Sequence, residues 1–181
     1  CSDLLVGAPG HDPSGNPDQD QGAAFLFFGS TEGLKTPARV SNFAQNVGTC
    51  DGELEGASCS AVMLWPNTSL WPQSALGGSY NEFGFSVSFI GDFNADGYDD
   101  LAIGDPEASF HGDLNGAARD GVVGEVGNVA IYFGSRFGLG TETPDASDQT
   151  AEFPFVLISP PIVEGGMRFG HSVHGGADVD G

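Results

Sequence analysis

The chain is strongly acidic and long enough for one domain of ordinary size. Its 181 residues include 25 Asp and Glu against 5 Lys and Arg, which gives a formal net charge of −20. This charge repels the phosphates of nucleic acids and anionic lipid headgroups, so we expect no nucleic-acid partner and no binding to membrane surfaces. The chain also lacks the run of about 18 apolar residues that a spanning helix needs, so we expect no membrane insertion.

Glycine and proline occur throughout the sequence. The 29 glycines and 11 prolines interrupt every window in which an amphipathic helix could form, and they leave short runs of Val, Ile, Phe and Leu. Short apolar runs bounded by turn residues are typical of strands. The predicted fold class is therefore all-β.

The first strand is predicted at Ala24–Phe28. A long insertion at residues 40–80 follows it. Cys50 and Cys59 lie in a Gly-rich part of the insertion, at a spacing that a disulfide can close. We predict that they form a disulfide that orders this loop in an oxidising compartment. Two free thiols in a cytosolic loop are the alternative.

The same insertion contains Trp65 and Trp71. Exposed Trp side chains can stack on sugar rings, which would suit a glycan-binding protein. We favour the simpler interpretation, in which both rings pack beneath the insertion.

The run Asp92–Asp100 carries the strongest chemical signal in the chain. Positions 1, 3, 5 and 9 of this run carry oxygen-bearing side chains, and position 6 is Gly. Hard cations such as Ca²⁺ prefer six to eight oxygen ligands, and converging carboxylates repel one another unless a cation lies between them. We therefore predict a calcium loop. Its predicted side-chain ligands are Asp92, Asn94, Asp96 and Asp100.

The residues after the loop exclude a helix-loop-helix site. Such a site needs an acid at position 12 of the loop, where this chain has Ile103. Leu101–Ile103 is instead a short apolar run that ends at Gly and Pro, which predicts a buried strand. The calcium loop should thus join two strands, Val87–Ile90 and Leu101–Ile103. Further strands are predicted at Val129–Phe133 and near Phe153–Ile158.

Three sequence landmarks occur twice in the same order. The matching pairs are Asp3–Pro9 with Asp100–Pro106, Phe28–Leu34 with Phe133–Leu139, and Phe83–Val87 with Phe169–Val173. We interpret each copy as a small four-stranded antiparallel sheet with apolar residues on both faces, which must stack between neighbours to be stable. Radial stacking into a β-propeller satisfies this requirement.

The order of motifs between Phe83 and Pro106 resembles the FG-GAP repeat of integrin α-subunit propellers and their bacterial relatives. Phe-Gly-x-Ser-Val is followed by Gly-Asp-x-Asn-x-Asp-Gly-x-x-Asp-Leu and then by Ile-Gly-x-Pro. The resemblance covers Phe83–Leu139 and the later half of the first copy. It implies a propeller of roughly seven blades with calcium in certain blade loops. It also implies that Tyr98 contributes its carbonyl oxygen as a calcium ligand.

On this interpretation the chain supplies about two four-stranded blades. Blade unit one covers residues 1–82 with the insertion 40–80, unit two covers residues 83–168, and residues 169–181 start a next unit. Asp178 and Asp180 occupy positions 1 and 3 of a second calcium loop, and Asp3 occupies position 9 of the same kind of loop. The chain has no initiating Met and no signal peptide, so we expect it to be processed or excised, and a secretion signal could have been lost.

The predicted partners are therefore the remaining blades of the same propeller or further copies of this chain. If it is a fragment of a longer array, which we favour, the other blades come from the same protein. If it is a protomer, copies could close a ring head to tail.

The predicted function is extracellular adhesion or recognition of a protein or glycan ligand by a secreted or cell-surface protein, with Ca²⁺ as a structural clamp. We predict no enzymatic activity, because the four histidines have no catalytic spacing and no phosphate-binding loop occurs. A scaffold or accessory propeller of a secreted hydrolase or lyase is one alternative. A purely structural repeat module is another.

Overall fold

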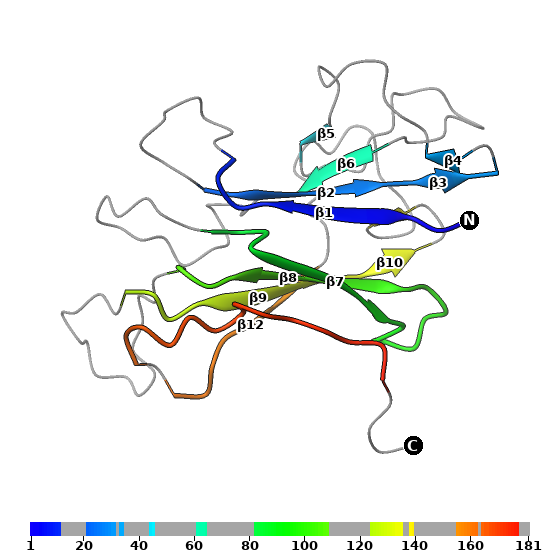
Figure 1. Ribbon diagram of the computed structural model, residues 1–181. Helices are drawn as coiled ribbons and strands as arrows, with labels where there is room; N and C mark the ends of the chain where they lie inside the picture. The colour runs from blue at the N-terminus through cyan, green and yellow to red at the C-terminus, as the bar shows by residue number, and fades with distance from the viewer. Residues whose placement is uncertain are drawn as a thin grey trace, which may run out of the picture.

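A computed structural model shows an all-β fold for the residues that it describes (Figure 1). These residues are 1–11, 21–31, 33–34, 44–45, 61–64, 82–108, 124–135, 138–139, 155–162 and 164–177. Their strands are β1 (Leu4–Ala8), β2 (Ala23–Phe27), β3 (Gly29–Ser30), β4 (Gly33–Leu34), β5 (Ala44–Gln45), β6 (Ala61–Leu64), β7 (Ser86–Gly91), β8 (Asp100–Asp105), β9 (Asn128–Tyr132), β10 (Gly134–Ser135), β11 (Gly138–Leu139) and β12 (Phe155–Ile158). This described part holds no helix that could cross a membrane. The all-β prediction is confirmed.

Two four-stranded sheets lie one above the other in Figure 1. The first has the strand order β1-β2-β6-β5 and the second has the order β12-β9-β8-β7. Every pairing in the second sheet is antiparallel, as predicted for a blade. In the first sheet β5 pairs with β6 in the parallel sense over two residues. The first sheet therefore departs from the all-antiparallel blade that the repeat predicted.

Three strands of the first sheet repeat three strands of the second. The matching landmarks make β1 and β2 the counterparts of β8 and β9, and the sheet order makes β6 the counterpart of β12. In both copies the Phe-Gly-Ser…Gly-Leu segment forms a two-stranded antiparallel ribbon, β3-β4 in the first and β10-β11 in the second. The predicted strand Ala24–Phe28 is observed as β2 and the predicted strand Val129–Phe133 as β9, each shifted by one residue.

The core lies between the two sheets. Side chains alternate between the faces of a strand, so Leu26 and Leu64 of the first sheet face the same core as Leu101, Ile103 and Tyr132 of the second. None of these five side chains is more than 3% exposed. Burial of each contributes about 1.5–3 kcal/mol, so this layer holds the sheets together.

The Phe-Gly landmarks connect one unit to the next. Phe83 is fully buried and pairs with Gly22 in an isolated parallel bridge, and Phe169 pairs with Gly127 in the same way. We name these contacts the first and the second joint. The first joint consists of Gly22, Phe83 and Gly84, and the second consists of Gly127, Phe169 and Gly170.

The Gly of each Gly-x-Pro landmark is required where two backbones touch at a joint. A Cβ atom on Gly7 would overlap the carbonyl oxygen of Gly84, and a Cβ atom on Gly104 would overlap that of Gly170. The hydroxyl of Ser86 also donates a hydrogen bond to the Gly170 carbonyl over 2.6 Å. Phe169 and Gly170 therefore dock on the second sheet through the same backbone contacts that Phe83 and Gly84 make with the first.

Candidate metal site

The acidic run forms the loop of the antiparallel hairpin β7–β8, at one end of the second sheet (Figure 1). The prediction that this loop joins two strands is confirmed. A β-bulge between Phe89 and Gly91 leads into the loop. Gly97, the predicted position 6, has a φ of 94°, which an L side chain rarely adopts, and the loop needs it to turn sharply.

The polar side chains of the loop turn inward and accept backbone N–H groups. The Asp92 carboxylate accepts the amide of Asp96 over 2.9 Å and that of Gly97 over 2.8 Å. Asp96 accepts the amide of Tyr98 over 2.9 Å, and Asn94 donates its side-chain amide to Asp96 over 2.8 Å. The Asn94 oxygen accepts the Asp96 amide over 3.1 Å. The predicted ligands are thus gathered on the inside of one turn.

Asp100 closes this loop from inside the sheet. Its side chain is 0% exposed. One carboxylate oxygen accepts the amides of Phe93 (2.8 Å) and Asn94 (3.3 Å), and the other accepts the amide of Gly134 over 2.8 Å. Asp100 therefore ties the start of the loop and the start of β10 to the start of β8.

The donor chemistry of the loop fits a hard divalent cation. Carboxylate and amide oxygens are the ligands that Ca²⁺ prefers, and an oxygen that accepts one N–H group keeps a second lone pair. In the described part of the chain, however, no three His, Cys, Asp or Glu side chains lie close enough together to hold a metal ion. A bound cation would therefore require the carboxylates of Asp92 and Asp96 to rotate toward a common point.

The other predicted site residues fall into two groups. Asp3 lies in the described part and accepts the amide of Gly29 over 2.8 Å, which matches the contact between Asp100 and Gly134. The remaining predicted residues lie outside the described residues. They are the ligands Asp178 and Asp180, the pair Cys50 and Cys59, and the aromatic residues Trp65 and Trp71.

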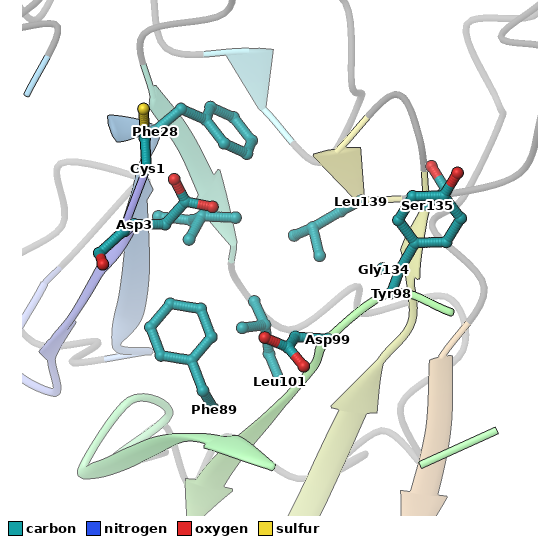
Figure 2. A pocket seen from close by; sticks show the side chains of 12 residues that line it. Cys1, Asp3, Phe28, Phe89, Tyr98, Asp99, Leu101, Gly134, Ser135 and Leu139 are labelled. Carbon is teal, nitrogen blue, oxygen red and sulfur yellow. The ribbon is translucent and has the colours of Figure 1, made fainter. Parts of the chain in front are cut away.

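A cavity of about 510 Å³ lies between the two units, next to the end of the acidic loop. Figure 2 shows the rings of Phe28, Phe89 and Tyr98 around it, together with the carboxylates of Asp3 and Asp99. Leu26, Leu101 and Leu139 add apolar lining. This combination suits a ligand with an apolar or sugar-ring face that also donates hydrogen bonds.

A second charged cluster lies at the opposite end of β8 and was not predicted. One nitrogen of the Arg168 guanidinium lies 3.1 Å from Glu82 and 2.6 Å from Glu107. Asp105, the last residue of β8, is 0% exposed and accepts the amide of Glu82 over 3.0 Å. Burial raises the pKa of Asp105 to about 7 and also raises the pKa of Glu107, and nearby carboxylates add to both shifts. The available signal was that residues of opposite charge precede the two Phe-Gly pairs, as Glu82 and Arg168.

The sequence is similar to known proteins over more than half of its length. Over 117 residues, or 65% of this chain, the sequence is 33% identical to integrin alpha-7 of Rattus norvegicus. Over 99 residues, or 55% of the chain, it is 33% identical to integrin alpha-PS3 and 35% identical to integrin alpha-PS5 of Drosophila melanogaster. This chain is similar to the integrin α subunits. The resemblance predicted from its motifs is confirmed.

The similarity covers only a small part of each integrin α subunit. The integrin-α-like chain spans no more than 8% of the length of these relatives. The activity and the partners of whole integrins can therefore only be proposed for this chain. No protein-family model matches the chain. The two stacked sheets and their repeated joints are consistent with the β-propeller that this similarity implies.

Proposed function

We propose that this chain is a calcium-stabilised segment of a secreted or cell-surface β-propeller that serves adhesion or ligand recognition. The observation that carries the proposal is the loop Asp92–Asp100, whose ligand-type side chains gather inside one turn between two strands. The similarity to integrin α subunits supports the adhesive role and the location at the cell surface.

The cation would act as a structural clamp. Inward-facing carboxylates repel one another, and backbone N–H groups offset this repulsion only in part. The loop could offer Ca²⁺ the side chains of Asp92, Asn94, Asp96 and Asp100, and the carbonyl oxygen of Tyr98. Binding would neutralise the loop and stabilise the hairpin β7–β8.

Calcium binding is tested by removing one ligand. The intact chain should take up Ca²⁺, and Asp96→Ala should weaken the affinity by about tenfold or more, measured by titration calorimetry. At a calcium concentration about 100-fold above the Kd, chelation should lower the Tm of the unchanged chain by roughly 5–10 °C.

Asp99→Ala is the matched control, because Asp99 is an exposed acid of the same loop and holds no ligand position. Its affinity for Ca²⁺ should equal that of the unchanged chain. Equal affinity in Asp96→Ala, or a Tm that does not respond to chelation, would contradict the clamp.

Neighbouring blades would cover the outer faces of the two sheets. Leu4 and Val6 of β1 are 44% and 40% exposed, and Val156 and Ile158 of β12 are 45% and 36% exposed. These residues alternate with the core-facing ones, so each sheet has an apolar outer face like the faces that meet in the core. We propose that preceding and following units of a longer array pack there, and further copies of this chain are the alternative.

The mass in solution distinguishes these partners. We expect the isolated chain to sediment as a monomer of 18.6 kDa, because the covering units of an array would be missing. A multiple of this mass that Val6→Asp reduces to the monomer would show instead that copies of the chain cover these faces. A multiple that survives both Val6→Asp and Val156→Asp would contradict both arrangements.

The cavity in Figure 2 is the surface that best suits ligand recognition. Phe89 and Tyr98 are 38% and 41% exposed, so their rings are accessible to a ligand. The carboxylate of Asp3 already accepts the Gly29 amide, which gives it a structural task. Accessible rings and a structurally committed carboxylate favour binding over hydrolysis at this position.

A further inference from the structure

The charged cluster at the end of β8 connects both joints to the end of that strand. Glu82 directly precedes Phe83 of the first joint, and Arg168 directly precedes Phe169 of the second. The amide of Glu82 donates to a carboxylate oxygen of Asp105 over 3.0 Å, and Arg168 pairs with the Glu82 side chain over 3.1 Å. Arg168 also reaches Glu107, in the turn after β8, over 2.6 Å. Equivalent residues of successive repeats are thus joined to each other and to the same strand end.

The cluster has too few cations for its carboxylates. Glu82 and Glu107 face Asp105 from the segments before β7 and after β8, and Glu125 adds a negative charge near Glu107. Arg168 interacts with Glu82 and Glu107, whereas Asp105 has no cationic partner in the described part of the chain. The negative charges of Glu82 and Glu107 lie near Asp105, and no cation in the described part of the chain pairs with Asp105. Both conditions make ionisation of Asp105 unfavourable.

The burial of Asp105 further disfavours the ionised form of its side chain. Its side chain is 0% exposed, and its second carboxylate oxygen is buried without a hydrogen-bond partner among the described residues, while the nearby amides of Glu82 and Ala108 offset only part of the cost of burying the charge. The Nε atom of Arg168 is buried without a partner in the same part of the chain. A buried oxygen without a donor tolerates the neutral acid far better than the carboxylate.

We propose that Glu82, Asp105, Glu107 and Arg168 form a proton-responsive lock on the two joints. The lock holds the joints tightly while Asp105 is neutral, and it loosens when Asp105 ionises and repels the two glutamates that Arg168 holds. The proposal does not depend on calcium binding or on the adhesive role.

The first repeat shows that the fold itself does not require this acid. Gly7-Ala8-Pro9 is the counterpart of Gly104-Asp105-Pro106, so Ala8 occupies the position of Asp105. The first joint makes the same backbone contacts beside Ala8 that the second makes beside Asp105. Asp105 therefore adds a property to the second sheet that the joint geometry does not need.

The direction of the pH effect follows from the two pKa values of Asp105. The ordinary pKa of 3.8 applies to the unfolded chain, and the folded chain holds the proton until about pH 7. Between these values the unfolded chain binds fewer protons, so stability falls as the pH rises and then levels off above pH 7. The lock should be tightest in mildly acidic solution.

The test compares the Tm of the unchanged chain and of Asp105→Asn between pH 4.5 and pH 8, at one fixed calcium concentration. Asn resembles the neutral acid and cannot ionise, so the difference in Tm between the two proteins should be smallest at pH 4.5, close to the ordinary pKa of 3.8. At pH 8 the Asn variant should melt higher by about 5 °C or more. The protection of the Phe83 and Phe169 amides against hydrogen exchange should rise in the same variant and at the same pH.

A second variant and an NMR titration test whether the pH dependence comes from Asp105 itself. Asp105→Ala introduces the residue of the first repeat and should also remove the extra pH dependence, which shows whether the Asn side chain itself disturbs the site. The carboxyl carbon of Asp105, followed by NMR, should titrate near pH 7. A midpoint near pH 4, or a Tm difference that is the same at pH 4.5 and pH 8, would overturn the lock.

Discussion

Gly127→Ala is expected to destabilise the chain by about 4 kcal/mol. Gly127 has a φ of 82°, and a Cβ atom there would overlap the backbone of Phe169. The variant would therefore add a backbone strain of about 1–2 kcal/mol to a collision with main-chain atoms that cannot rotate away. Because the second joint holds residues 169–177 on the second sheet, it should open before the sheet unfolds. Denaturant unfolding measures the loss of stability.

Two other glycines separate the causes of this effect. Gly166 has a φ of 78°, and a Cβ atom added there would meet no other atom within 4 Å, so Gly166→Ala should cost only about 1 kcal/mol. Gly124 has neither a positive φ nor a close neighbour, so Gly124→Ala should change stability by less than about 0.5 kcal/mol. If Gly127→Ala costs no more than Gly166→Ala, the joint is not a tight backbone contact.

Asp100→Ala should cost about 3 kcal/mol even when calcium is removed by a chelator. The carboxylate accepts three amides, from Phe93, Asn94 and Gly134, and the alanine variant would leave them without this acceptor. The Gly134 amide lies in a buried position, so water cannot easily replace the lost partner. Unfolding in chelator and in calcium separates this loss from the loss of a calcium ligand.

Two variants of the same loop serve as controls for Asp100. Asp99→Ala removes an exposed carboxylate from the adjacent position and should leave the stability within about 0.5 kcal/mol. Asp100→Asn keeps one acceptor oxygen and should lose less stability than Asp100→Ala. A cost that appears only in calcium would show that Asp100 acts as a cation ligand alone.

The sequence predicted those parts of the fold that depend on local patterns. Apolar runs between turn residues located β2, β7, β8, β9 and β12, because alternation and strand length are visible within a few residues. The repeat predicted a sheet in each copy, and both sheets are observed. The parallel strand β5 was not predicted, because two residues carry no periodicity and their partners Val62 and Met63 lie 18 positions further along the chain.

In the candidate metal site, too, the sequence predicted the local features and missed the contacts between distant residues. Its predicted ligands lie within nine residues, so spacing alone was enough to predict the site. The contact between Asp100 and Gly134 joins residues 34 positions apart and could not be derived from spacing. The cluster around Asp105 combines three distant segments, so its only signal was the opposite charges of Glu82 and Arg168 before the two Phe-Gly pairs.

The repeated joints bear on how such a chain can diverge and be engineered. The connection from β2 to β6 covers residues 28–60, and its counterpart from β9 to β12 covers residues 133–154, yet the equivalent strands pair in the same way. The entropic cost of closing a loop rises slowly with its length, by about 0.6 kcal/mol per doubling. Natural drift can therefore lengthen or shorten these connections almost neutrally while the joint glycines stay constrained. For the same reason, these connections are the natural places to graft a foreign peptide.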